Sequence, residues 1–440
     1  MMTGVLKKTG DLRIQIKRET GVGPATSTLA RSRSTTELFP HGEATISYSK
    51  FFVKRICVFS FFCAGKNPNE FLLSILFLTI INNMPSQLLH TLFGEDVSAG
   101  IFRRLEGRFG TAAAEALETI QRTHKKVFAL GCQGPDIFYH SRRRRPVGLE
   151  YGTLLHRRGV GRFTAELLAL ALPQPPAGEM SALAVYALGF MTHAILDRAA
   201  HPFIVYKSCR LSPPKQGALS FAQSHAFFER IIDALMFKTL RGADVAAWDQ
   251  DGLLAQTCAS PPNALKELLA RALLLAFPER AGKDGKLASR IENTFLDCAV
   301  FYCLTAPVNV ARESASVPLH ERKSRLVYVY PEKLPQNVDF LNLEKRPWFY
   351  PAGRERADTR SFPELYAAAA AKAADSLAGL IGRYLEEGTF PVQEASELIG
   401  NGGLSIVDEA GVPCPPCRTG PLPLDEVMDW LVKGAGEWSP

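Results

Sequence analysis

The chain has 440 residues, of which 46% are hydrophobic and 22% are charged, a composition typical of globular proteins that excludes a disordered or fibrous chain. The formal net charge of +7 is uneven, because residues 1–83 hold 11 Lys and Arg against 5 Asp and Glu, and the remaining residues hold 40 against 39. A body this close to neutral does not favour nucleic acid as a partner. The nine cysteines are scattered and odd in number, which argues against a disulfide framework.

The first 83 residues mix Lys, Arg, Ser and Thr without a sustained hydrophobic period, and we expect a poorly structured extension there. They include two apolar runs, residues 58–65 and 71–81. The longer run has 11 residues, whereas a helix needs about 20 to cross a bilayer. Neither run has the position or the cleavage site of a signal peptide, which favours a cytoplasmic over a secreted protein. Met84 is an alternative start of the chain.

Helical patterns dominate from Met84 onward. The segments expected to be helical are residues 98–131, with two amphipathic stretches, and residues 178–200, 219–240, 262–277 and 362–388. Pro202 is expected to limit the helix over 178–200, since the residue before a proline avoids the helical region. Ser220 and Gln223 predict a capping box at the start of the helix over 219–240. Gly388 predicts a helix end.

Strand patterns are rare, and residues 325–332 (RLVYVYPE) are the segment that favours a strand. The sequence therefore predicts an all-α fold, a compact multi-helix bundle over residues 84–390, followed by a Pro/Gly-rich tail over 391–440. Cys414 and Cys417 in this tail have the spacing of metal ligands. No second such pair follows them, so we interpret them as part of a loop rather than as a zinc knuckle.

A polar pattern interrupts the apolar sequence around residue 197. His193, Asp197 and His201 follow one another at intervals of four residues, so their side chains lean to one side of a helix. Two imidazoles and a carboxylate in apolar sequence each need a partner. Either these groups satisfy one another or a cation joins them.

The expected helix over 219–240 repeats this pattern with His225, Glu229 and Asp233. A histidine and a carboxylate at positions i and i+4 can both bind one cation. Two neighbouring helices thus carry residues that can bind metal among apolar ones.

Further candidates lie upstream: His90, Asp136 on a Gly-Pro turn, and His156. Each of them alone is more typical of a hydrogen-bonded core or turn residue. Together with the two helical patterns they make eight candidate ligands, and one zinc ion takes four. Imidazole and carboxylate without thiolate favour a hydrolytic site with more than one metal ion over a structural zinc site.

The order and types of these residues resemble the zinc-dependent phospholipase C family, which is related in fold to S1/P1-type nucleases. The family motif is a His, an Asp, a His, HxxxD, a His and HxxxE. In the same order, this chain has His90, Asp136, His156, the pair His193 and Asp197, then His201, and the pair His225 and Glu229. The segments GPDIF and HAILDRAAHPF also look like the bacterial branch of the family, and the match spans residues 90–229.

The resemblance implies a compact helical bundle that holds two to three zinc ions. It implies three ligand sets: Asp136, His156, His193 and Asp197 for the first ion; His201, His225 and Glu229 for the second; and His90 with a bridging Asp197 for the third. Asp233 lies outside the motif, so its replacement is expected to leave metal content and activity nearly intact.

The function that follows is hydrolysis of a phosphodiester by a water that zinc activates, with Asp136 as the candidate general base. The first-choice substrate is a phospholipid head-group ester, which makes a membrane surface a possible partner. Two alternatives remain open at this point. The first is a single-strand nuclease of the same fold, which the basic run at residues 142–145 would serve, although that run is also typical of a solvated loop. The second is a non-catalytic helical protein that metal stabilises.

Overall fold

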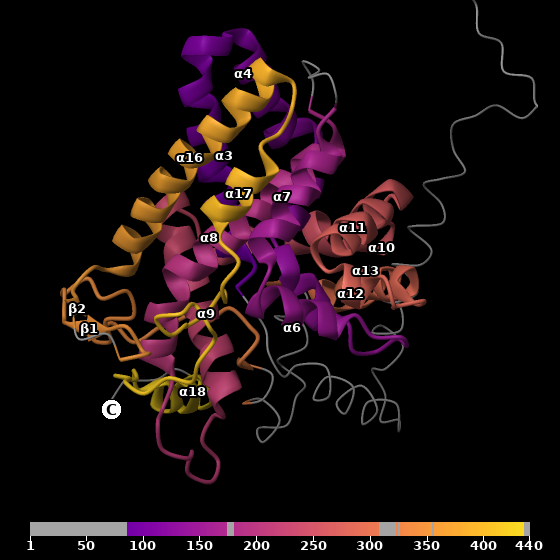
Figure 1. Ribbon diagram of the computed structural model, residues 1–440. Helices are drawn as coiled ribbons and strands as arrows, with labels where there is room; N and C mark the ends of the chain where they lie inside the picture. Colours follow the sequence, from indigo (N-terminus) through magenta and orange to yellow (C-terminus); the bar gives the residue numbers. More distant parts are fainter. Residues whose placement is uncertain (1–85, 174–179, 308–322, 324–325, 354–355, 435–440) are drawn as a thin grey trace, which may run out of the picture. The chain divides into compact units, whose positions relative to one another are not determined.

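The computed structural model of the protein describes residues 86–173, 180–307, 323, 326–353 and 356–434 (Figure 1). The expected extension over residues 1–83, and with it the alternative start at Met84, lies outside the described residues. The described chain is mostly helical with very little strand, which confirms an all-α fold. Among the described helices, none is both long and apolar enough to cross a membrane.

The described elements follow one another along the chain. They are α3 (Leu88–Phe109), α4 (Thr111–Glu118), η1 (Thr119–Thr123), α5 (Lys125–Gly131), η2 (Gly134–His140), α6 (Leu149–Arg157), α7 (Val160–Ala171), α8 (Ala182–Ser208), α9 (Phe221–Arg241), η3 (Val245–Ala247), η4 (Asp251–Ala255), α10 (Gln256–Ala259), α11 (Asn263–Ala276), α12 (Pro278–Ala281), α13 (Leu287–Thr305), β1 (Trp348–Phe349), β2 (Ala357–Asp358), α16 (Phe362–Glu387), α17 (Val392–Ile399) and α18 (Leu424–Val432).

Helix α8 is the central element of this unit. It contacts α3, α5, α7, α9 and α16, and α16 in turn lies along α3 (Figure 1). Most of its residues are buried, so it is surrounded by other helices over nearly all of its length. Because the residues that precede and follow each of its polar positions are packed, the direction of each polar side chain is fixed by the core.

The expected end of this helix near Pro202 is wrong, because α8 continues without interruption to Ser208. A proline inside a helix removes one backbone hydrogen bond and normally costs about 3 kcal/mol. Phe203, Ile204 and Val205 after the proline are buried in the core, and their packing offsets that cost. As a consequence, His201 lies inside the same helix as Asp197, one turn away from it.

Two predicted helix signals are confirmed and the predicted strand is not. Ser220 and Gln223 form a capping box at the start of α9, and Gly388 ends α16 with φ of 75°. Residues 326–332 form no strand. The aromatic side chains of that segment, including Tyr330, are buried against the helices, and no strand pairs with it. The described strands are β1 and β2, a short antiparallel pair.

Residues 391–434 do not form the separate tail that the sequence predicts, because they pack onto the helices. Helix α17 lies against α7, and the amide of Leu404 donates to the carbonyl oxygen of His156 at 2.9 Å. Arg198, the neighbour of Asp197 on α8, donates from its guanidinium to the carbonyl oxygens of Gly400, Gly402 and Gly403 at 2.8, 2.9 and 3.3 Å. The C-terminal segment is thus tied to the two helices that carry His156 and Asp197.

Replacing Arg198 with methionine is expected to lower the free energy of unfolding by about 2 kcal/mol or more, because charged hydrogen bonds of this kind contribute about 1.5–3 kcal/mol each. Urea denaturation measures the change. Arg122→Met is the matched control, since Arg122 pairs with Glu118 one helical turn away at the surface, and such pairs contribute only a few tenths of a kcal/mol. Equal losses in the two variants would contradict this role of Arg198.

Candidate metal centre

All eight residues predicted as ligands meet at one place in the structure. They come from five elements: His90 from α3, Asp136 from η2, His156 from α6, His193, Asp197 and His201 from α8, and His225 and Glu229 from α9. Their nitrogen and oxygen atoms form three groups in which the donor atoms lie within 4.8 Å of one another: His90, His193 and Asp197; Asp136, His156 and His193; and His201, His225 and Glu229.

Asp197 lies between these groups. Its Oδ1 is 3.3 Å from Nε2 of His90 and 3.5 Å from Nδ1 of His201, and its Oδ2 is 3.2 Å from Nε2 of His193. Oδ2 is also 3.9 Å from Nε2 of His156. Both oxygens therefore face imidazole nitrogens, and each faces a different part of the cluster. This is the arrangement in which one carboxylate can bridge two cations.

The other two carboxylates each serve one side of the cluster. Oδ1 of Asp136 is 2.9 Å from Nε2 of His156, and its Oδ2 is 3.7 Å from Nε2 of His193. Oε1 of Glu229 is 3.1 Å from Nε2 of His225, one helical turn before it. Each of the five histidines thus faces at least one of the three carboxylates.

Backbone carbonyls orient two of the imidazoles. Nδ1 of His193 lies 3.1 Å from the carbonyl oxygen of Cys132, and Nδ1 of His156 lies 2.8 Å from that of Gly152. A carbonyl oxygen accepts only, so Nδ1 carries the proton in each neutral ring and donates it. The lone pair is then on Nε2, which faces the cluster. Metal-binding histidines are typically fixed in this way by a second partner.

Several buried atoms of the cluster have no hydrogen-bond partner within the described chain. They include Oδ2 of Asp136, Nε2 of His193, Oδ2 of Asp197, Nδ1 of His201 and Oε2 of Glu229. An unpaired buried polar atom costs about 1–3 kcal/mol, and charged groups cost more. These atoms come from the candidate ligands and point into a common centre, so the donor set fits bound cations.

The pKa values show how strongly the cluster attracts positive charge. Burial lowers the pKa of His193, but Asp197 and Asp136 outweigh it and raise this pKa to about 9. Burial also lowers the pKa of His201, and Asp197 and Glu229 raise it to about 10. Burial would raise the pKa of Asp197, yet the facing histidines hold it well below its usual range. The negative charge of three buried carboxylates must therefore be balanced nearby, either by protonated imidazoles or by metal ions.

The centre opens on one side. The side chains of His156, His201 and His225 are 14, 12 and 20% exposed, whereas the remaining five are at most 4% exposed. Aromatic rings lie beside two of these three histidines. Tyr139 packs on His156 with ring centroids 4.5 Å apart, and Phe221, which is half exposed, packs on His225 at 5.8 Å.

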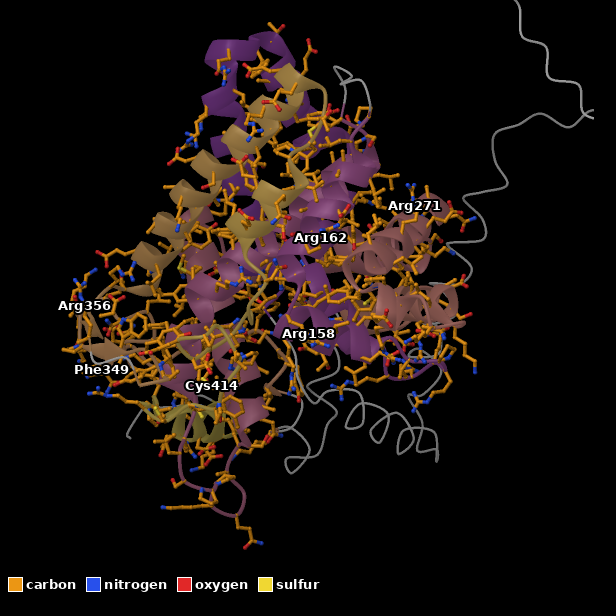
Figure 2. All side chains as sticks on the ribbon, viewed as in Figure 1. Arg158, Arg162, Arg271, Phe349, Arg356 and Cys414 are labelled. Atoms are coloured by element: carbon orange, nitrogen blue, oxygen red, sulfur yellow. The ribbon has the colours of Figure 1, made fainter. Side chains whose placement is uncertain are left out.

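The remaining candidate features include none of the eight candidate ligands. The basic run at residues 142–145 is partly held by the protein itself, since the amides of Arg143 and Arg144 and the guanidinium of Arg144 all donate to Asp297. Cys414 and Cys417 are free thiols in a loop, as predicted, and neither belongs to a group that could hold a metal (Figure 2 labels Cys414).

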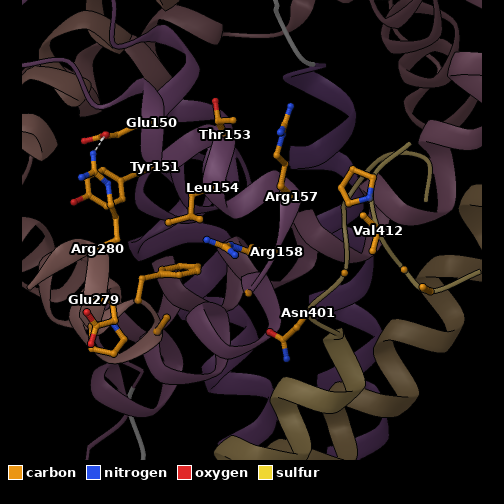
Figure 3. A pocket seen from close by; sticks show the side chains of 18 residues that line it. Glu150, Tyr151, Thr153, Leu154, Arg157, Arg158, Glu279, Arg280, Asn401 and Val412 are labelled. Carbon is orange, nitrogen blue, oxygen red and sulfur yellow. Dashed lines mark hydrogen bonds and ion pairs between the residues drawn. The ribbon is translucent and has the colours of Figure 1, made fainter. Parts of the chain in front are cut away.

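A groove of about 1200 Å³ lies on the outer face of α6, between it, α12 and residues 401–413. Figure 3 shows Arg157 and Arg158 on this face and the ion pair of Arg280 with Glu150 beside them. None of the eight candidate ligands lines it, so this groove is separate from the metal centre.

The structural roles of two residues near the centre could not be predicted from the sequence. Gly134 allows η2 to pass against the ring of His193, and Asp233 binds the start of α3. Glycine before proline predicts only a turn, and the sequence around Asp233 does not indicate which residues it binds.

Comparison of the chain with protein-family models, with curated proteins and with solved structures finds no match. The resemblance to zinc-dependent phospholipases C therefore depends on two observations about this chain itself. The first is the order of the eight residues in the sequence. The second is that these residues, spread over residues 90–229, converge in the structure.

Proposed function

We propose that the protein is a zinc-dependent phosphodiester hydrolase of the phospholipase C type. The observation that carries this proposal is the convergence of His90, Asp136, His156, His193, Asp197, His201, His225 and Glu229 into three adjoining donor groups. Imidazole nitrogens and carboxylate oxygens face one another in these groups, yet several of the buried atoms make no hydrogen bond of good geometry, which favours cations at the centre over a hydrogen-bonded core. Two to three ions satisfy these atoms, and His193 binds only one of them through Nε2.

Zinc suits these donors better than the other common metals. The groups contain imidazole nitrogen and carboxylate oxygen without thiolate, a set that is typical of hydrolytic zinc sites. Calcium and magnesium prefer oxygen ligands alone, and five of the eight residues offer nitrogen. His201, His225 and Glu229 share no residue with the other two groups, and they are proposed to hold an ion of their own.

Bound zinc ions supply two effects to such a reaction, a lowered pKa for a coordinated water and neutralisation of charge on the phosphoryl oxygens. The chain supplies the rest. Asp136 is the proposed proton acceptor, because its Oδ1 is engaged with His156 at 2.9 Å while its Oδ2 has no hydrogen-bond partner. Its place in η2 is fixed by the core on both sides, since Pro135 and Ile137 are buried. A base held in this way is ready to take a proton without moving.

A phospholipid head-group ester is the proposed substrate. The half-exposed ring of Phe221 beside His225 suits an amphiphilic substrate that is presented at a membrane surface. A single-strand nuclease would need a basic groove beside stacking rings. The basic run at residues 142–145 is a weaker match for this, because Asp297 pairs with the guanidinium of Arg144 and holds Arg143 by its backbone amide.

Turnover of a chromogenic phosphocholine ester tests this function. We expect hydrolysis by the purified protein, a loss of more than about 100-fold on exposure to a chelator, and recovery when zinc is added back. Phosphatidylcholine vesicles in parallel should release the phosphorylated head group. The same preparations are incubated with single-stranded DNA.

Each result separates one function from the others. Cleavage of DNA but not of the ester would indicate the nuclease. Absence of turnover on either substrate, with a chelator lowering only the melting temperature, would indicate a metal-stabilised protein without catalysis. Either result contradicts the proposed phospholipase activity.

A further inference from the structure

Asp233 binds the first turn of a helix that lies far from it in the sequence. Its side chain is on α9, fully buried, and its carboxylate accepts hydrogen bonds from three consecutive backbone amides at the start of α3: Gln87 at 3.2 Å, Leu88 at 3.3 Å and Leu89 at 3.0 Å. The hydroxyl of Ser86 donates to the same carboxylate. Asp233 lies outside the motif of candidate ligands, yet in the structure it holds a helix terminus.

A helix terminus of this kind has amides that need acceptors. The first four N–H groups of a helix have no partner within it, and Gln87 provides no side-chain cap to α3. A carboxylate at this end also interacts favourably with the helix dipole. Asp233 thus caps the start of α3 from another helix, in place of a local capping residue.

Two other buried groups hold the Asp233 side chain in place. The hydroxyl of Tyr330 donates to Oδ2 at 3.1 Å, and the guanidinium of Arg230 lies 3.7 Å from the same oxygen. Arg230 also donates to Tyr330 at 2.7 Å and stacks over its ring. The side chains of Arg230 and Asp233 are at most 1% exposed, so the network is shielded from water and holds the carboxylate rigidly.

This contact links two parts of the metal centre. His90 follows Leu89 directly, so the amides that Asp233 binds belong to the same helical turn as the ligand. His90 in turn faces Asp197 at 3.3 Å and stacks on His193 with ring centroids 3.9 Å apart. Asp233 lies one turn after Glu229 on α9. Helix α9, which carries two of the candidate ligands, therefore also fixes the start of α3, which carries His90.

We infer that Asp233 is a positioning residue, which holds the first turn of α3 against α9 so that His90 faces Asp197 and the donor group formed by these two residues is preformed. This inference depends on the proposed function in taking that group as a metal site. Asp233 itself binds no metal in this proposal. Without it, three amides at the start of α3 lose their acceptor, and the ion that needs His90 loses affinity first.

Zinc titration of the full chain tests the inference. Wild-type protein should bind three ions, and the ion held by His90 and the bridging Asp197, which has the fewest ligands from the chain, should be the weakest. Asp233→Asn should lower the affinity for the weakest ion by about 10- to 100-fold, the usual effect of losing a residue that orients a ligand, and leave the other two ions unchanged. His90→Ala should lose the same ion, and adding Asp233→Asn to it should cause no further loss of metal, because both changes act through one ligand.

Asp297→Asn is the matched control. Asp297 is another buried carboxylate that accepts two backbone amides and an arginine, but it binds residues 143 and 144, which are not ligands. Both variants should lose thermal stability, and only Asp233→Asn should lose the weakest ion. Amide hydrogen exchange at residues 87–91 should become faster in Asp233→Asn alone. Should Asp233→Asn not fold, Ser86→Ala removes one donor from the same carboxylate and should weaken the same ion to a smaller extent.

The possible outcomes separate this inference from the proposed function. Three ions of unchanged affinity in Asp233→Asn would overturn the positioning role alone. An equal loss of the weakest ion in Asp297→Asn would overturn it as well, because general destabilisation would then explain the result. A wild-type protein without stoichiometric zinc would overturn the proposed function, and the positioning role would fall with it.

Discussion

Replacing Asp197 with asparagine is expected to remove most of the bound metal and to lower phosphodiester hydrolysis by more than about 100-fold. Both oxygens of this carboxylate face imidazoles, with His90 at 3.3 Å on one side and His193 at 3.2 Å on the other. Asparagine has nearly the same size but carries no charge and only one acceptor oxygen. Two cations in a poorly solvated centre would then be less compensated, and at least one of them would leave.

Elemental analysis of the purified variant measures the metal, and ester turnover measures the rate. Asp297→Asn serves again as the control, since it makes the same chemical change at a buried carboxylate that accepts amides outside the centre. A protein in which the eight residues merely form a hydrogen-bonded core predicts similar losses of stability in both variants and no selective loss of metal. Similar metal content in the two would therefore reject the bridging role of Asp197.

The ligands could be found from the sequence because their signal is local. His193, Asp197 and His201 lie in one helix, and intervals of four residues place them on one side whatever surrounds the helix. His225 and Glu229 follow the same rule on α9. The all-α class was predictable for the same reason, since the period of apolar residues is a property of each segment.

His90, Asp136 and His156 show where local reasoning ends. Each is a single residue in its own element, and nothing within its segment indicates that it meets the helical ligands. The order of types along the chain, through its resemblance to a family, supplied that prediction. The structure then brings their side chains to within a few ångströms of α8.

The features that sequence reasoning missed all concern packing between distant segments. Pro202 does end helices in isolation, yet the buried residues after it keep α8 continuous. The C-terminal segment is rich in proline and glycine, yet its carbonyl oxygens accept hydrogen bonds from Arg198 and tie it to α8. Asp233 lies 144 to 147 positions from the groups it binds, a pairing that no periodicity expresses. Tertiary packing decides each of these cases, and a local pattern contains no information about it.

Gly134→Ala is expected to lower the free energy of unfolding by about 2–5 kcal/mol and to disturb the donor groups that contain His193. Gly134 has φ of 53°, a left-handed conformation that costs other residues about 1–2 kcal/mol. A Cβ atom at this position would also lie 2.3 Å from Cγ of His193, far inside van der Waals contact. Relieving such a clash in a packed core costs about 1–3 kcal/mol more.

The direction of this clash makes the substitution informative about the metal centre. The ring of His193 belongs to two of the three donor groups, and it is held between Gly134 and the carbonyl oxygen of Cys132. A methyl group on the one side pushes the ring away from Asp136, which lies two residues further along η2. The ion that His193 binds should therefore weaken, while the ion of His201, His225 and Glu229 should remain.

Gly242→Ala separates backbone strain from the effect on His193. Gly242 ends α9 with φ of 65°, but a Cβ atom there would have no neighbour within 4 Å. The free energy of unfolding of this variant should fall only by the cost of the backbone conformation, about 1–2 kcal/mol, and its metal content should be unchanged. Chemical denaturation and zinc titration of the two variants give both quantities. If Gly134→Ala loses no more stability than Gly242→Ala and binds the same number of ions, His193 is not held in its ligand position by this glycine, and the packing of η2 against α8 is looser than the structure indicates.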